Sequence, residues 1–111
     1  MNVSIKDAGD ATIVKVEVEQ MLGYSGTEFQ EAVMNCIKSE KKCTIVDLSR
    51  VTFISSWGIG MLMYGFTTSQ NNGKDFRLAG VSEKIRDTFS KTKMNTVFKI
   101  YDTVEEAAAE I

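Results

Sequence analysis

The sequence predicts one α/β domain, in which a mixed, mostly parallel sheet of about four to five strands packs with about four helices. The chain has 111 residues, the size of one domain with one core, so residues 1–111 are treated as a single unit. Hydrophobic residues make up 43% and charged residues 25%, which is a globular balance. Segments with strand periodicity alternate with segments of helical periodicity, an order that favours parallel strands flanked by helices.

The first half of the chain predicts two strands, a helix and a buried strand. Residues 11–19 alternate apolar and charged side chains from Val14 onward, and residues 2–6 show a weaker form of this pattern. A helix follows, with Ser25 or Thr27 as its N-cap. The run at 44–48 is mostly apolar, as in a strand that is buried on both faces.

The second half predicts three further helices and two further strands. A helix from Trp57 to Ser69 stops at Asn71-Asn72-Gly73, which is a strong C-terminal signal. The remaining elements, in chain order, are a strand at 74–79, a helix opened by Ser82, a strand at 96–101 and a helix to Ile111 capped by Asp102 or Thr103.

The composition disfavours several classes of function. Histidine is absent, which removes Ser/His and Cys/His nucleophile pairs and most zinc sites. The Gly58-x-Gly60 segment lacks the third glycine of a dinucleotide-binding fingerprint. We therefore predict that the chain is not an enzyme and that it uses no metal and no cofactor.

Charge and cysteine usage point to a cytoplasmic protein. Thirteen basic and fifteen acidic residues give a net charge of -2, which argues against nucleic acid as a partner. Cys36 and Cys43 match neither a metal pair nor a redox motif, and they fit free thiols in a reducing compartment. No apolar leader and no run near the ~20 apolar residues of a membrane span is present, so we expect no membrane insertion.

Residues 47–60 carry the most informative motif, which reads Asp-Leu-Ser-Arg-Val-Thr-Phe-Ile-Ser-Ser-Trp-Gly-Ile-Gly. This motif resembles the STAS domain of bacterial anti-sigma factor antagonists. There, a strand ending in Asp-Leu-Ser leads to Asp-Ser-Ser/Thr-Gly-Leu-Gly at a helix start. The resemblance covers nearly the whole chain and is closest over residues 43–111. Ser55 replaces the family's aspartate, and Trp57 replaces a small residue.

The resemblance implies a regulatory protein that is switched by phosphorylation. Ser56 falls on the family's phosphoacceptor position, and Ser55 is the second choice. Such a protein would bind an anti-sigma factor that is a serine kinase, and so would free a sigma factor for transcription. Phosphorylation by the kinase would weaken binding, and a serine phosphatase would restore it. The alternative for both serines is a purely structural N-cap.

The helix after Ser56 has apolar side chains around its whole circumference. Ile59, Leu62, Met63 and Phe66 share one stripe that suits the sheet. Trp57, Met61 and Tyr64 then fall on another face, which a neighbouring helix, a second copy in a homodimer or a partner protein must cover. The predicted partner-binding residues are Ser55, Ser56, Trp57, Met61 and Tyr64. A second functional hypothesis is a STAS-type adaptor or scaffold, for example a subunit of a membrane transporter, without the phosphorylation switch.

Overall fold

A computed structural model describes residues 2–22 and 26–109 of the chain. Its main feature is a five-stranded sheet in which β1 is antiparallel to β2 and all other neighbours are parallel. The strands, in sheet order, are β1 (Val3–Ala8), β2 (Ala11–Val16), β4 (Cys43–Asp47), β6 (Asp75–Ala79) and β7 (Lys99–Tyr101). The prediction of a mixed, mostly parallel sheet is confirmed.

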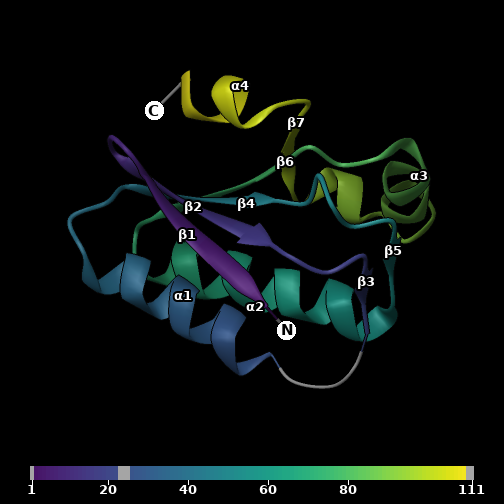
Figure 1. The fold of residues 1–111 in the computed structure, drawn as a ribbon, viewed down its shortest axis with the longest axis horizontal. Helices are drawn as coiled ribbons and strands as arrows, with labels where there is room; N and C mark the ends of the chain where they lie inside the picture. The colour runs from purple at the N-terminus through teal and green to yellow at the C-terminus, as the bar shows by residue number, and fades with distance from the viewer. Residues whose placement is uncertain (1, 23–25, 110–111) are drawn as a thin grey trace.

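The described part of the chain contains four α-helices, which pack around the sheet (Figure 1). Two long helices lie on one face, α4 lies on the opposite face, and α3 lies near one end of the strands. Their bounds are α1 (Thr27–Lys38), α2 (Ser56–Asn71), α3 (Glu83–Lys91) and α4 (Val104–Ala109). None of the helices in this part of the chain combines the length and the apolar character that a membrane crossing requires.

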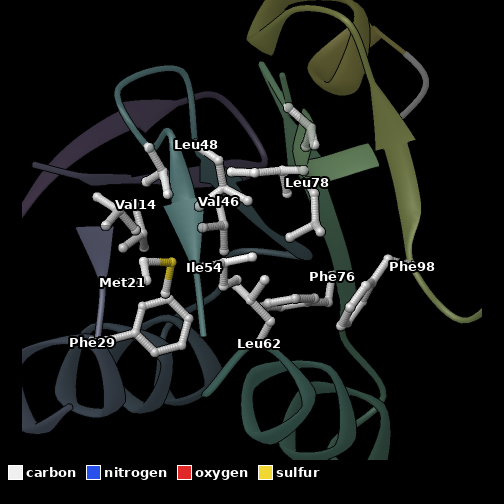
Figure 2. Packing of buried hydrophobic residues seen from close by; sticks show 14 of the residues in the cluster. Val14, Met21, Phe29, Val46, Leu48, Ile54, Leu62, Phe76, Leu78 and Phe98 are labelled. Carbon is white, nitrogen blue, oxygen red and sulfur yellow. The ribbon is translucent and has the colours of Figure 1, made fainter. Parts of the chain in front are cut away.

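The larger hydrophobic core lies between the sheet and the helices α1 and α2 (Figure 2). Strand residues such as Val14 and Val46 point toward Phe29 of α1 and Leu62 of α2, and all four side chains are fully buried. Burying each large apolar side chain of this kind stabilises the fold by about 1.5–3 kcal/mol. The opposite face carries a smaller cluster, made of Ala11, Ile13, Cys43, Ile45, Ala79 and Ala107.

The face that α2 turns to the core differs from the predicted stripe. The buried residues of α2 are Gly58, Leu62, Gly65 and Ser69, so the most buried face shares only Leu62 with the predicted stripe. Glycine allows this close approach, because a Cβ at Gly65 would lie 2.6 Å from Cε1 of Phe76. The other three residues of the predicted stripe are partly buried and pack at the edge of the core: Ile59, Met63 and Phe66.

Two short strands form a second, separate sheet that the sequence did not predict. These strands are β3 (Gln20–Met21) and β5 (Phe53–Ile54), and they pair in parallel. The first well-patterned strand was expected to run to Glu19, but β2 ends at Val16. The pairing of β3 with β5 holds the segment that leads into α2.

Several helix ends also differ from expectation. The N-cap of α1 is Gly26 rather than Thr27, while Ser25 lies outside the described residues. Met94–Thr96 form a 3-10 turn, so the last strand begins only at Lys99. The prediction of Thr103 as a cap for α4 is confirmed, because its hydroxyl oxygen accepts a hydrogen bond from the N–H of Glu106 at 3.1 Å.

Candidate functional site

The two serines at the start of α2 have different roles. Ser55 is the N-cap, and its hydroxyl oxygen accepts a hydrogen bond from the N–H of Gly58 at 3.3 Å. The same hydroxyl donates to the carbonyl oxygen of Met21 in β3 at 3.0 Å. Ser56 is the first residue of the helix and is exposed to solvent. Within the described chain, the Ser56 hydroxyl has no hydrogen bond, so it is available to another molecule.

The start of α2 is anchored to β3 and β5. The N–H of Ser55 donates to Met21 at 3.0 Å, and the N–H and hydroxyl of Thr52 both donate to the carbonyl oxygen of Glu19. A Cβ at Gly58 would lie 2.6 Å from Cγ1 of Ile54, which shows how closely the first turn packs on these strands. The backbone around Ser56 is therefore fixed by contacts that do not involve its side chain.

The electrostatics at this helix start favour an anion. The first turn of an α-helix leaves backbone N–H groups without partners and carries about half a positive charge. In α2 the cap satisfies the N–H of Gly58, while the first turn carries no acidic side chain. A phosphate on Ser56 would therefore meet N–H groups and no carboxylate from its own turn.

The three apolar residues predicted to bind a partner are only partly covered by the domain itself. Trp57, Met61 and Tyr64 are all half-buried. Trp57 and Met61 lie against Gly26 at the start of α1, where an added Cβ would be 3.3 Å from Cζ2 of Trp57. Met61 and Tyr64 also pack against the main core. The neighbouring helix thus accounts for part of this face, and the rest stays open to solvent.

Phe53 is a surface residue that the sequence analysis missed. It lies in β5, three residues before Ser56, and its side chain is 42% exposed. The Nζ atom of Lys84 in α3 is 5.9 Å from the centre of the Phe53 ring, within range of a cation–π contact. In sequence, residues 51–54 show only a short apolar run, and the alternation within β5 is what turns Phe53 outward and Ile54 inward. We call Phe53, Ser56 and Trp57 the α2-start surface.

Asp47 has a structural role at the end of β4. Its Oδ1 atom accepts a hydrogen bond from the N–H of Ser49 at 2.9 Å, and it lies against Gly80. Within residues 2–22 and 26–109, no three Cys, Asp or Glu side chains are grouped as a metal site would require. A surface hollow of about 280 Å³ lies beside α4, away from Ser56, and is lined by Ser4, Lys6, Ile13, Lys15, Asp47, Val104 and Glu105.

Comparison with known proteins identifies the class to which this chain belongs. The family model of the STAS domain matches residues 2–107, so the chain is a member of the STAS domain family. A Thermotoga maritima protein assigned as an anti-sigma factor antagonist is 33% identical over 64 residues. This match spans 58% of the present chain and 57% of that relative, less than two thirds of its length.

Solved structures share the fold. The crystal structure of an assigned anti-sigma factor antagonist from Thermotoga maritima has a TM-score of 0.82 at 24% identity, with 98% of this chain and 93% of that chain covered. The anti-sigma factor antagonist SpoIIAA in its unphosphorylated form has a TM-score of 0.77 at 14% identity, covering 96% and 92%. A sulfate transporter family protein from Wolinella succinogenes has a TM-score of 0.73 at 15% identity, covering 92% and 84%.

Proposed function

We propose that this chain acts as an anti-sigma factor antagonist that is switched by phosphorylation of Ser56. The α2-start surface would dock on an anti-sigma factor that is a serine kinase, and a phosphate on Ser56 would weaken the complex until a serine phosphatase removed it. The observation that carries this proposal is the contrast between the two serines. The Ser56 hydroxyl is exposed and without a partner, whereas the Ser55 hydroxyl is occupied in holding the helix start.

The contrast also favours Ser56 over Ser55 as the phosphoacceptor. A kinase must bring a hydroxyl into line with the γ-phosphate, which requires an accessible side chain. Phosphorylation of Ser55 would remove the hydroxyl proton that it donates to the carbonyl oxygen of Met21, and losing such a hydrogen bond typically costs about 1 kcal/mol. Ser56 can be modified without breaking that bond.

The α2-start surface is suited to a switch because it combines an exposed hydroxyl with two aromatic side chains that are exposed or half-exposed. Phe53 is exposed and Trp57 is half-exposed, so a partner that covers them would also remove Ser56 from water. A phosphate adds roughly -1.5 to -2 charges at neutral pH. Burying that charge against two aromatic rings is costly unless the partner supplies cations. The modified chain would keep its fold and lose its docking contact.

The test uses the chain and the anti-sigma serine kinase from the same cells. Incubation with kinase and ATP should place one phosphate on Ser56 by mass spectrometry, and Ser56→Ala should prevent it. Ser56→Asp should weaken binding at least tenfold in calorimetry, because it puts a negative charge at the docking surface. Ser90→Asp is the matched control, since Ser90 is an exposed helical serine in α3 and should bind like the parent chain. Normal binding by Ser56→Asp, together with an unmodified Ser56, would refute the switch.

The adaptor hypothesis is the second candidate, and the exposed aromatic residues of the α2-start surface favour it. Phe53 and Trp57 would serve equally well as permanent anchors for a scaffold or a transporter. The shared fold of the Wolinella succinogenes transporter family protein makes such a context reasonable. An adaptor predicts that Phe53→Ser abolishes partner capture while Ser56→Asp does not. A phosphorylation switch predicts that both substitutions abolish it.

A further inference from the structure

The outer strand of the sheet, β1, presents an unpaired hydrogen-bonding edge. It pairs with β2 in an unbroken antiparallel register from Val3↔Val16 to Ala8↔Ala11. The N–H of Glu17 donates to the carbonyl oxygen of Asn2 at 2.8 Å, which continues the ladder by one pair. In an antiparallel ladder, hydrogen-bonded and non-hydrogen-bonded pairs alternate. Even-numbered residues of β1 therefore bond to β2, while Val3, Ile5 and Asp7 direct their backbone N–H and C=O groups outward.

This edge carries two exposed charged residues, Lys6 and Asp7, but it has neither of the two backbone features, a proline or a bulge, that also protect exposed strands. Within residues 2–22 and 26–109, no strand pairs with the outer side of β1, which is the near strand in Figure 1. The strand has six residues without a bulge, and the chain contains no proline. Ile5, in its middle, is 56% exposed, which is more than Phe53 at 42%.

We propose that β1 is a dimerisation edge that pairs in antiparallel fashion with β1 of a second copy, with the two-fold axis at Ile5. In this register Ile5 faces Ile5 of the second copy, and Val3 faces Asp7 of the second copy. All three outward-facing residues of each strand then make backbone hydrogen bonds. The two sheets become one continuous sheet, and the exposed Ile5 side chains cover each other.

The charges on the strand select this register over its neighbours. Centring the axis on Lys6 would place two lysines directly opposite each other, which is destabilising. Centring it on Ser4 would leave Asp7 outside the pairing and reduce the number of hydrogen bonds. With the axis at Ile5, Lys6 lies opposite Ser4 of the second copy. Asp7 is ion-paired with Lys41 within its own chain, which neutralises its charge next to Val3.

The proposed interface is separate from the α2-start surface. It uses β1, whereas that surface is built from β5 and the start of α2. Each copy in the dimer would keep its own docking surface, so a dimer could bind a bivalent partner with a gain in avidity. The dimer proposal does not depend on the phosphorylation proposal.

The test measures the mass of the full chain by sedimentation over a range from micromolar to millimolar concentration. The parent chain should approach twice its own mass as the concentration rises. Ile5→Lys should raise the dimer dissociation constant at least tenfold, because it places like charges at the axis. Asp7→Pro should have a similar effect, since proline removes an outward N–H and no bond to β2. Asp7→Asn is the matched control, because it loses the ion pair but keeps that N–H, and it should dimerise normally.

Amide hydrogen exchange gives a second readout that a different interface would not reproduce. On dimerisation, the amides of Val3, Ile5 and Asp7 should become protected, whereas those of Ser4 and Lys6 should be protected in the monomer already. Circular dichroism confirms that each variant is folded. A parent chain that stays monomeric throughout the range would overturn the proposal. So would a dimer that persists in both Ile5→Lys and Asp7→Pro.

Discussion

One methyl group added at either of two glycines in α2 should change the stability of the domain in opposite directions. An added Cβ at Gly60 would meet no atom within 4 Å. Alanine is favoured over glycine in a helix by about 1 kcal/mol, because glycine loses more backbone entropy on folding. We therefore expect Gly60→Ala to raise the free energy of unfolding by about 0.5–1 kcal/mol.

Gly58→Ala gains the same helix propensity but creates close contacts. Its Cβ would lie 2.6 Å from Cγ1 of Ile54 and 3.0 Å from both Cβ and the carbonyl oxygen of Met21. Overpacking of this kind costs typically 1–3 kcal/mol. Because the propensity gain is common to both variants, their difference isolates the packing cost. We expect Gly58→Ala to be less stable than Gly60→Ala by about 1–3 kcal/mol.

Urea unfolding followed by circular dichroism measures both free energies. Thermal melts give a second check, with a shift of about 4 °C per kcal/mol for a domain of this size. Gly65→Ala should behave like Gly58→Ala, since its Cβ would lie 2.6 and 2.8 Å from two atoms of the Phe76 ring. If Gly58→Ala and Gly60→Ala are equally stable, α2 does not pack on β3 and β5 as described. The account of how Ser56 is positioned would then be wrong.

Further predictions concern the cap, a buried thiol and an ion pair. Ser55→Ala should lower the free energy of unfolding by about 1 kcal/mol through loss of the N-cap, whereas Ser56→Ala should change it by less than about 0.5 kcal/mol in the same urea titration. Burial raises the pKa of the Cys43 thiol to about 12, so a thiol reagent at pH 8 should modify it only after unfolding. Burial opposes ionisation of Asp75, but hydrogen bonds from Arg77 and a neighbouring lysine outweigh it and lower its pKa. Because the folded-state pKa of Asp75 is lowered, its ionisation stabilises the fold at pH values above the unfolded pKa of about 3.9. This stabilisation is lost as the pH falls from there through the folded-state pKa. Asp75→Asn should therefore be destabilising at pH 7 and less so near pH 3.

The strands and helices with a clear amphipathic pattern could be predicted from sequence. The α1 helix is an example, because Phe29, Ala32, Val33 and Cys36 recur at helical spacing and all are buried. Pattern reasoning failed for α2, where apolar residues surround the helix and no stripe stands out. There the buried face is set by where the backbone can approach the sheet, which the small residues Gly58 and Gly65 allow. Hydrophobicity scales give glycine little weight, so the true face was hidden.

In the candidate site, too, the sequence predicted some features and missed others. The family-like motif was enough to propose Ser56 as the phosphoacceptor, but it could not show which of the two serines caps the helix. That distinction depends on β3, a two-residue strand distant in sequence, which supplies the carbonyl oxygen that Ser55 bonds. Phe53 was missed for a related reason, because its outward direction follows from the pairing of β5 with β3. Contacts between short, distant segments leave almost no periodic signal.

At the start of α2, the residue that holds the helix in place is next to the serine proposed to be phosphorylated. Ser55 holds the helix cap and the bond to β3, while Gly58 sets the distance between the helix and the strands. The Ser56 side chain takes part in neither of these contacts, so a charge placed on it should disturb the fold little. Had Ser55 served both as cap and as phosphoacceptor, each phosphorylation would also have removed the hydroxyl proton that bonds the carbonyl oxygen of Met21, at a cost of about 1 kcal/mol. Domains are only marginally stable, so under the proposed switch this separation would let a phosphate on Ser56 change docking without bringing the domain near unfolding.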